Sequence, residues 1–160
     1  MIFVTVGKGL HSFDRLVKAA DDLAAEMGEK VFIQYGCSSY KPVHAEGRDY
    51  VTFPEAQELT RTSSIMIAHA GIGTIIGALR SGIPIVIVPR YKKNGEHFND
   101  HQLEIAEAVK GRPGVEVIYE GEALLPVVKR LMELKEPLKP QVSGTGLINA
   151  IDEFLSGLNG

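Results

Sequence analysis

"SIMIAHAGIGTIIGALRSGIPIVIV", residues 64–88, holds two short apolar runs separated by a segment with helical periodicity. The runs 64–69 and 84–88 are almost continuously apolar, which predicts strands covered on both faces, as in a parallel sheet. Residues 73–81 are predicted to form the helix between them, and Gly82 suits the end of that helix because glycine readily adopts a left-handed backbone. A strand, a helix and a strand in this order indicate a parallel α/β unit.

The same alternation extends along the chain in both directions. Polar, turn-rich residues 37–48 predict a loop, Ser12 is the expected N-cap of the first helix, and Pro54 suits the first turn of a short helix. Further strands are predicted at 2–6, 30–35, 50–53 and 115–119, and further helices at 13–27, 99–110 and 122–134. The sequence therefore predicts an α/β fold with a single Rossmann-like, doubly wound parallel sheet.

Length and composition limit the possible classes of protein. The 160 residues are expected to form one domain, residues 1–160, in which 135–142 form a linker and 143–158 a C-terminal amphipathic helix. A net charge of −3 argues against a nucleic-acid partner. The lone Cys37 excludes an internal disulfide and fits a reducing cytoplasm. We recognise neither a signal peptide nor a run long enough to span a membrane, so no direct membrane span is expected.

Three polar or glycine-rich segments follow predicted strands, namely 7–11, 69–74 and 89–102. In open α/β sheets, ligands bind beyond the carboxyl ends of the strands, near the switch in strand order. We therefore expect these three segments to meet in one site.

The segment "HAGIGT", residues 69–74, runs from a strand end into a helix start. Gly71 and Gly73 would let the backbone approach a ligand, and the helix N-terminus suits a phosphate. Both glycines could equally serve only a tight turn. In "VGKGLH", residues 6–11, Lys8 could meet a phosphate or simply face water.

The stretch "PRYKKNGEHFNDHQLEIA", residues 89–106, is unusually rich in hydrogen-bonding side chains. It could hold a metal, hold a sugar or face solvent. His97 and His101 are four residues apart, but their order differs from the H-E-x-x-H of zinc proteases, and a helix starting near Asp100 leaves His97 outside it. Sugar hydroxyls both donate and accept hydrogen bonds, as Asp, Gln, Asn and neutral His can. A sugar site is therefore the preferred interpretation, and no metal is expected.

A nucleophilic enzyme has little support in the sequence. No feature ties a histidine to Cys37, and no G-x-S-x-G nucleophile elbow is present. A small self-sufficient hydrolase is therefore disfavoured.

Taken in order, the segments resemble the donor-binding half of the MurG-like glycosyltransferases, and above all its free-standing members. These are the PssE-type subunits of bacterial exopolysaccharide synthesis and their eukaryotic counterparts in lipid-linked glycan synthesis. The matching pieces are "MIFVTVG", "FDRLVKA", "IAHAGIGT" and "GIPIVIVPR" running into "GEHFNDHQLEIA". They cover about residues 1–110 in the right order and spacing.

The resemblance implies one half of a GT-B architecture, the donor-binding subunit of a two-component hexosyltransferase. Such a subunit binds a UDP-sugar as substrate, needs no cofactor or bound metal, and meets a membrane-anchored subunit that holds the lipid acceptor and usually the catalytic base. It would thus work in the cytoplasm, peripheral to the inner face of a membrane. The implied donor-binding residues are Gly7, Lys8, His69, Gly71, Gly73, Thr74, Arg90, Glu96, His97, Asp100, His101 and Gln102.

Within that set, Gly71–Thr74 would lie against the diphosphate, and Gln102 with Asp100 or His101 would take the sugar hydroxyls. Two positions depart from the family. Gly77 replaces a glutamate that usually holds the ribose, and Lys8, Gly9 and Leu10 replace a more polar run. These departures predict weak nucleotide binding and keep open an alternative, a non-catalytic nucleotide-sugar-binding or scaffold module.

Overall fold

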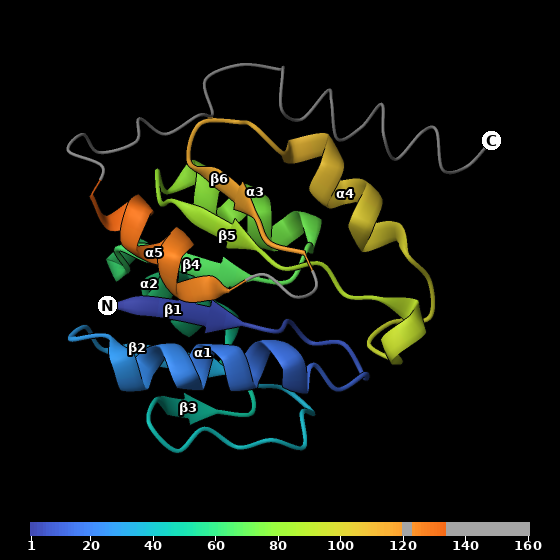
Figure 1. Cartoon of the computed structure of the whole chain (residues 1–160), viewed down its shortest axis with the longest axis horizontal. Helices are drawn as coiled ribbons and strands as arrows, with labels where there is room; N and C mark the ends of the chain where they lie inside the picture. The colour runs from blue at the N-terminus through green and yellow to red at the C-terminus, as the bar shows by residue number, and fades with distance from the viewer. Residues whose placement is uncertain (120–122, 134–160) are drawn as a thin grey trace.

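The computed structural model describes residues 1–119 and 123–133, and its centre is a parallel sheet (Figure 1). The six strands are β1 (Ile2–Thr5), β2 (Val31–Gln34), β3 (Glu46–Arg48), β4 (Ile65–Ala68), β5 (Ile85–Ile87) and β6 (Val115–Val117). Their order is β3-β2-β1-β4-β5-β6, and every neighbouring pair is parallel. The order reverses between β1 and β4, so a ligand site is expected beyond the carboxyl ends of these two strands. The predicted doubly wound sheet is confirmed.

Helices cover both faces of the sheet (Figure 1). They are α1 (Asp14–Glu26), α2 (Phe53–Thr62), α3 (Ile72–Arg80), the 3-10 turn η1 (Lys92–Asn94), α4 (His101–Val109) and α5 (Leu124–Met132). Because side chains alternate along a strand, Ile2 and Val4 pack with α1 and α5, whereas Phe3 packs with α3 and α4. None of the helices in the described ranges is long and apolar enough to cross a membrane. The expected linker 135–142 and helix 143–158 lie outside the described residues.

Two local predictions are wrong. The third strand is Glu46–Arg48, inside the expected loop, and not residues 50–53. Its side chains are exposed, because this edge strand is held by backbone pairing with β2 and not by apolar burial. Residues after it lead into α2, where Thr52 and Glu55 form a capping box and Pro54 occupies the first turn.

Ser12 does not cap α1. The N-cap is Phe13, whose ring is fully buried, and no side chain caps the helix. The Phe13 N–H instead donates to the Ser38 hydroxyl at 3.0 Å, which ties the start of α1 to the loop after β2. Burial of the phenyl ring fixes the helix entry here, and the local capping preference of serine is overridden.

A buried carboxylate on α1 organises the loop that precedes β3. The Asp21 side chain has no exposed surface, and it accepts hydrogen bonds from the N–H groups of Val43, His44 and Ala45 and from the Tyr40 hydroxyl. Burial alone would raise the pKa of Asp21, but these hydrogen bonds outweigh it and lower the pKa to about 2. The ionised carboxylate therefore replaces the backbone partners that the irregular loop lacks.

We expect Asp21→Asn to lower the free energy of unfolding by about 2 kcal/mol at neutral pH, because it removes the charged acceptor. A folded-state pKa below the ordinary value stabilises the protein fully above about pH 4, and this contribution is lost as the pH falls toward about 2. Urea unfolding at both ends of this range should therefore show the difference between the native chain and Asp21→Asn shrinking in acid. Asp22→Asn, at an exposed position of the same helix, is the matched control. A pH-independent difference would contradict the assignment.

Candidate functional site

A cavity of about 290 Å³ lies at the carboxyl ends of β1, β4 and β5. Its walls come from the β1–α1 loop, the β4–α3 turn and the β5–α4 loop. The lining residues are Val6, Gly9, Leu10, His11, His69, Arg90, Glu96, His97, Phe98 and Gln102. A larger cleft, of about 530 Å³, lies at the edge strand β6, but the Arg130–Glu116 ion pair crosses its lining and it is remote from the switch in strand order. The smaller cavity is therefore the candidate site.

Arg90 joins two of the three walls. Its side chain is 2% exposed, and its guanidinium donates to the carbonyl oxygens of Val6 at 2.7 Å, His11 at 2.8 Å and Glu96 at 2.8 Å. It also lies over the Phe13 ring, 4.6 Å from the ring centroid. Burial lowers the pKa of Arg90, an effect that the Glu96 carboxylate opposes. Since its donors are largely directed at protein carbonyls, Arg90 shapes the cavity more than it offers free hydrogen bonds to a ligand.

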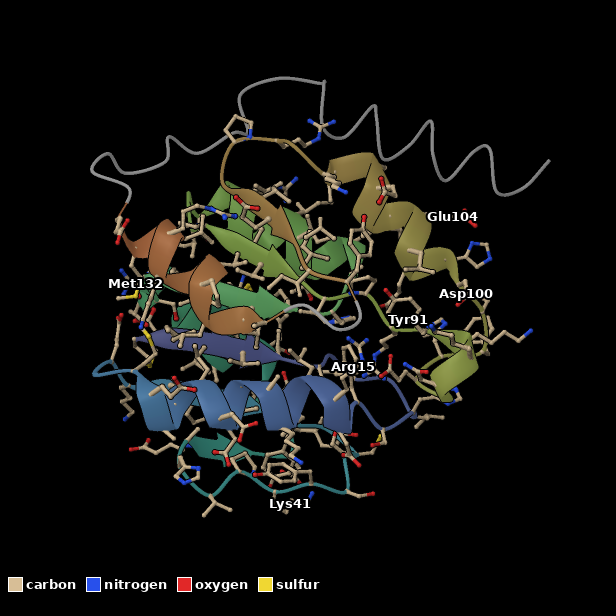
Figure 2. All side chains as sticks on the ribbon, viewed as in Figure 1. Arg15, Lys41, Tyr91, Asp100, Glu104 and Met132 are labelled. Carbon is tan, nitrogen blue, oxygen red and sulfur yellow. The ribbon has the colours of Figure 1, made fainter. Side chains whose placement is uncertain are left out.

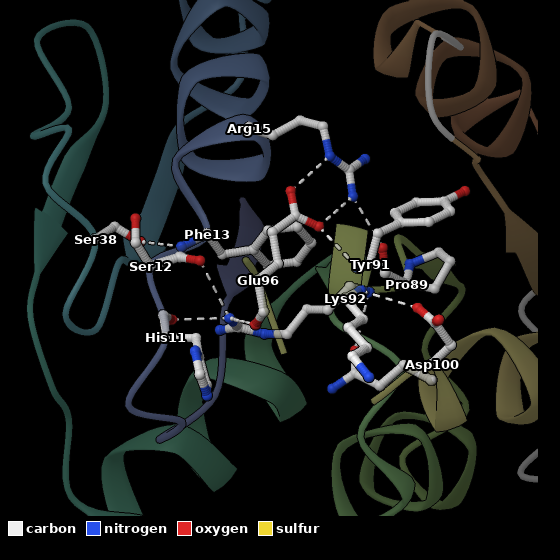
Figure 3. Close-up of polar contacts among 12 residues, drawn as sticks. His11, Ser12, Phe13, Arg15, Ser38, Pro89, Tyr91, Lys92, Glu96 and Asp100 are labelled. Atoms are coloured by element: carbon white, nitrogen blue, oxygen red, sulfur yellow. Dashed lines mark hydrogen bonds and ion pairs between the residues drawn. The ribbon is translucent and has the colours of Figure 1, made fainter. Parts of the chain in front are cut away.

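Glu96 is held from outside the cavity by Arg15 of α1 (Figure 3). Arg15 Nε and Nη2 each donate to one carboxylate oxygen of Glu96 at 2.9 Å, and Nη2 also donates to the Pro89 carbonyl oxygen at 2.9 Å. The Tyr91 N–H reaches the same carboxylate at 2.9 Å. Both oxygens of Glu96 thus have protein partners, although this residue lines the cavity.

Gln102 links the ends of β4 and β5. Its Oε1 accepts hydrogen bonds from the N–H groups of Ala70 at 3.2 Å and Arg90 at 3.1 Å. Two backbone donors fix which end of the amide is oxygen, so the Nε2 group is the end left for a ligand. At this position Gln102 can donate to a ligand but offers it no free acceptor.

His69 lies between the glycine-rich turns. A Cβ atom built on Gly7 would come within 2.5 Å of the His69 ring, and one on Gly71 would come closer still. Burial, followed by the nearby Arg90 charge, lowers the pKa of His69 to about 4. The imidazole is therefore neutral at physiological pH, and its Nδ1 is a buried atom without a hydrogen-bond partner in the described part of the chain.

The rim of the cavity is aromatic and apolar. The His97 ring stacks on Phe98 with a centroid distance of 4.4 Å, and the His11 ring lies 6.2 Å from His97. Leu10 and Phe98 are 91% and 68% exposed, respectively. The two loops thus present large apolar side chains to solvent at the rim of a cavity that also holds buried polar groups.

The N-terminus of α3 lies beside His69. Gly71 is its N-cap, with no side-chain cap, and the Ile75 N–H makes the first intrahelical bond to the Gly71 carbonyl oxygen. The preceding N–H groups of the first turn thus have no intrahelical acceptor. Together with the helix dipole, they form an arrangement that suits an anion.

The structure brings most of the predicted site residues to this end of the sheet. His69, Arg90, Glu96, His97 and Gln102 line the cavity, and Gly7 and Gly71 pack against His69. Lys8 belongs to the same loop as Gly9, Gly73 and Thr74 lie in the first turns of α3, and Asp100 and His101 start α4. The last five do not line the cavity, and Asp100 accepts a hydrogen bond from the Lys92 N–H at 2.9 Å.

The rim residues Leu10 and Phe98 and the supporting residue Arg15 were not predicted from the sequence. Leu10 and Phe98 could have been proposed as site residues, since both belong to segments expected at the strand ends. Arg15 gave no local signal, because its partner lies 81 positions away. Among residues 1–119 and 123–133, no group of three or more His, Cys, Asp or Glu side chains is placed to hold a metal ion.

The strand order and the cavity at the switch point define the chain as a Rossmann-like domain of the kind found in GT-B glycosyltransferases. The calicheamicin glycosyltransferase CalG4 matches 99% of this chain with a TM-score of 0.67 at 18% identity, and the chain covers 43% of it. The family can also be stated: the chain belongs to the glycosyltransferase family 28 C-terminal domain family, whose model matches residues 1–152.

This chain also has relatives that are shorter than CalG4. The UDP-N-acetylglucosamine transferase subunit ALG13 of Yarrowia lipolytica is 31% identical in an alignment of 122 residues, gaps included, that covers 67% of this chain and 59% of that protein. The chain thus spans less than two thirds of this relative. A solution structure of ALG13 matches 94% of this chain and 93% of its own length, with a TM-score of 0.59 at 20% identity.

We expect Gly71→Ala to destabilise the protein by about 1–3 kcal/mol, because the added methyl group overlaps the His69 ring while Gly7 crowds the same edge of that ring. Gly73→Ala is the matched control, since among the residues that the structure describes no atom outside α3 lies within 4 Å of a Cβ at that position. Thermal unfolding of both variants tests the packing. Equal stability of the two would show that His69 can move freely.

Proposed function

We propose that this chain is the donor-binding component of a two-chain glycosyltransferase, which transfers a hexose or N-acetylhexosamine from a UDP-sugar to a lipid-linked acceptor. One observation carries the proposal: a cavity lined by fixed polar groups opens at the switch in strand order, next to an uncapped helix N-terminus. The family match and the similarity to the Yarrowia UDP-N-acetylglucosamine transferase subunit support a glycosyl donor with a UDP group.

The diphosphate is assigned to the first turn of α3, from Gly71 to Thr74, with Lys8 on the opposite loop. The free N–H groups and the dipole of α3 favour its negative charge, so no bound metal or cofactor is needed. The neutral His69 ring offers one ring nitrogen as a hydrogen-bond partner beside the glycine turn, and it adds no positive charge there.

The sugar is assigned to the side of the cavity formed by the β5–α4 loop. There the Nε2 group of Gln102 donates to a hydroxyl oxygen, and His97 lies at the rim. Asp100 and His101 start α4 just beyond the cavity and would meet the outer hydroxyls of a bound hexose. Arg90 and Glu96 shape this wall through their contacts with protein atoms.

The acceptor and the catalytic base are assigned to a second chain that is anchored in a membrane, whose inner, cytoplasmic face this chain would approach. Support comes from the similarity to the Yarrowia relative, which is a transferase subunit. The resemblance to MurG-like transferases and to PssE-type subunits of exopolysaccharide synthesis favours the same division of labour.

Gly77 favours a second candidate function, a non-catalytic nucleotide-sugar-binding or scaffold module. This position lies in α3. The resemblance to MurG-like transferases implies a glutamate here that holds the ribose. Sugar transfer by the chain together with its partner would separate the two functions, whereas UDP binding is common to both.

The proposal is tested by calorimetric titration with UDP and with a UDP-sugar, for the native chain and for Gln102→Glu. Glutamate still accepts the two backbone hydrogen bonds but can no longer donate to the sugar, so the fold should persist. We expect one UDP site, and a loss of affinity about 10-fold greater for the UDP-sugar than for UDP. Absence of UDP binding would overturn the proposed function, and equal losses would overturn the sugar role of Gln102.

We expect the native chain to bind UDP weakly and Gly77→Glu to tighten binding by about 10- to 100-fold, since a carboxylate can form charge-assisted hydrogen bonds with the ribose hydroxyls. Outside α3 itself, no atom of the described residues lies within 4 Å of a Cβ at Gly77, so a side chain can start here without a clash. Gly77→Ala is the control, because it improves helix propensity without adding a carboxylate. UDP dissociation constants that are equal for the two variants would show that the missing carboxylate does not limit affinity.

A further inference from the structure

Arg15 lies outside the cavity but binds the β5–α4 loop, which forms one of the cavity walls. It projects from the first turn of α1 toward Tyr91 and the β5–α4 loop (Figure 2). Its guanidinium makes the paired hydrogen bonds to Glu96, and it lies 5.2 Å from the ring centroids of both Phe13 and Tyr91. The Arg15 and Glu96 side chains are only 27% and 7% exposed, so this ion pair is shielded from water.

The β5–α4 loop makes a tight turn around Gly95. After η1, Gly95 takes a left-handed backbone with φ of 69°, and the Glu96 N–H donates to the Tyr91 carbonyl oxygen at 3.2 Å. The Glu96 carboxylate then accepts from the Tyr91 N–H at 2.9 Å, which closes the loop on itself. His97 and Phe98 follow directly, so the placement of Glu96 determines where these two rings stand at the rim.

We propose that Arg15 is a positioning residue for the sugar end of the donor site, an inference that rests on the proposed function. Its ion pair with Glu96 holds the β5–α4 loop so that His97 and Phe98 bound the space beside Gln102. Arg15 acts through Glu96 and touches no ligand. The diphosphate side, at α3, is built from a different turn and does not depend on this pair.

The contacts of Arg15 distinguish a positioning role at one wall of the cavity from a contribution to the stability of the whole site. Arg90 ties the β5–α4 loop to the β1–α1 loop from inside the cavity, so its loss disturbs both walls. In the described part of the chain, the hydrogen bonds and ring contacts of Arg15 are with Pro89, Tyr91 and Glu96 of the β5–α4 loop and with the Phe13 ring. Glu96 left without Arg15 is a nearly buried carboxylate with one remaining backbone donor, which favours movement of the loop toward water.

The test compares Arg15→Gln and Arg15→Lys with Arg48→Gln, which removes an exposed ion pair with Glu55 next to β3. We expect Arg15→Gln to weaken UDP-sugar binding by about 10-fold while UDP binding changes by less than about 2-fold. Lysine keeps the charge but loses the paired geometry, so Arg15→Lys should recover part of the affinity. The control should bind both ligands as the native chain does.

Hydrogen exchange of the free protein provides a readout that needs no ligand. The backbone N–H groups of Tyr91 and Glu96 should exchange faster in Arg15→Gln, with protection of the central strands unchanged. Faster exchange without any UDP binding by the native chain would mean that the proposed function fails while the loop contact stands. UDP binding combined with unchanged exchange, or with equal losses for UDP and UDP-sugar, would overturn the positioning role.

Discussion

The buried guanidinium of Arg90 is the interaction on which the site depends. It stands at the end of β5 and is hydrogen-bonded to carbonyl oxygens at the end of β1, in the β1–α1 loop and in its own loop. Parallel strands leave such carbonyls without sheet partners where the strands end, and an unpaired buried carbonyl is costly. One planar cation with several donors satisfies three of them at once, and thereby fixes two loops relative to each other.

This arrangement sets the electrostatics of the cavity. Arg90 brings a positive charge to the wall, and its field, added to burial, keeps His69 neutral. Glu96 lies close enough to balance the cation, yet its oxygens are directed at Arg15 and Tyr91. The polar groups left for a ligand are therefore mainly donors, such as the Nε2 group of Gln102, set in a positive field, which would favour an anionic group over a cation.

The fold could be predicted from the sequence because its central strands are apolar runs with helical periods between them. β3 could not, since an exposed edge strand of Glu46, Gly47 and Arg48 has no apolar signature. The sequence also places the glycine turns and Gln102 at strand ends, and Gln102, Arg90 and Glu96 line the cavity there. The partners of Arg90 and Glu96 could not be predicted, because a single sequence does not reveal that Arg15 meets Glu96 or that Arg90 meets Val6.

Preorganisation explains why so much charge is buried around a small cavity. A loop that is already ordered loses little conformational entropy when a ligand binds, so a few hydrogen bonds can select the ligand. That advantage requires a rigid support, and the strand ends supply it through Gln102, whose oxygen joins β4 to β5. At Gly77, in α3, there is no comparable side chain. The β5–α4 wall is therefore the more firmly built part of the candidate site, so a ligand group bound there would meet better ordered contacts than one bound beside Gly77.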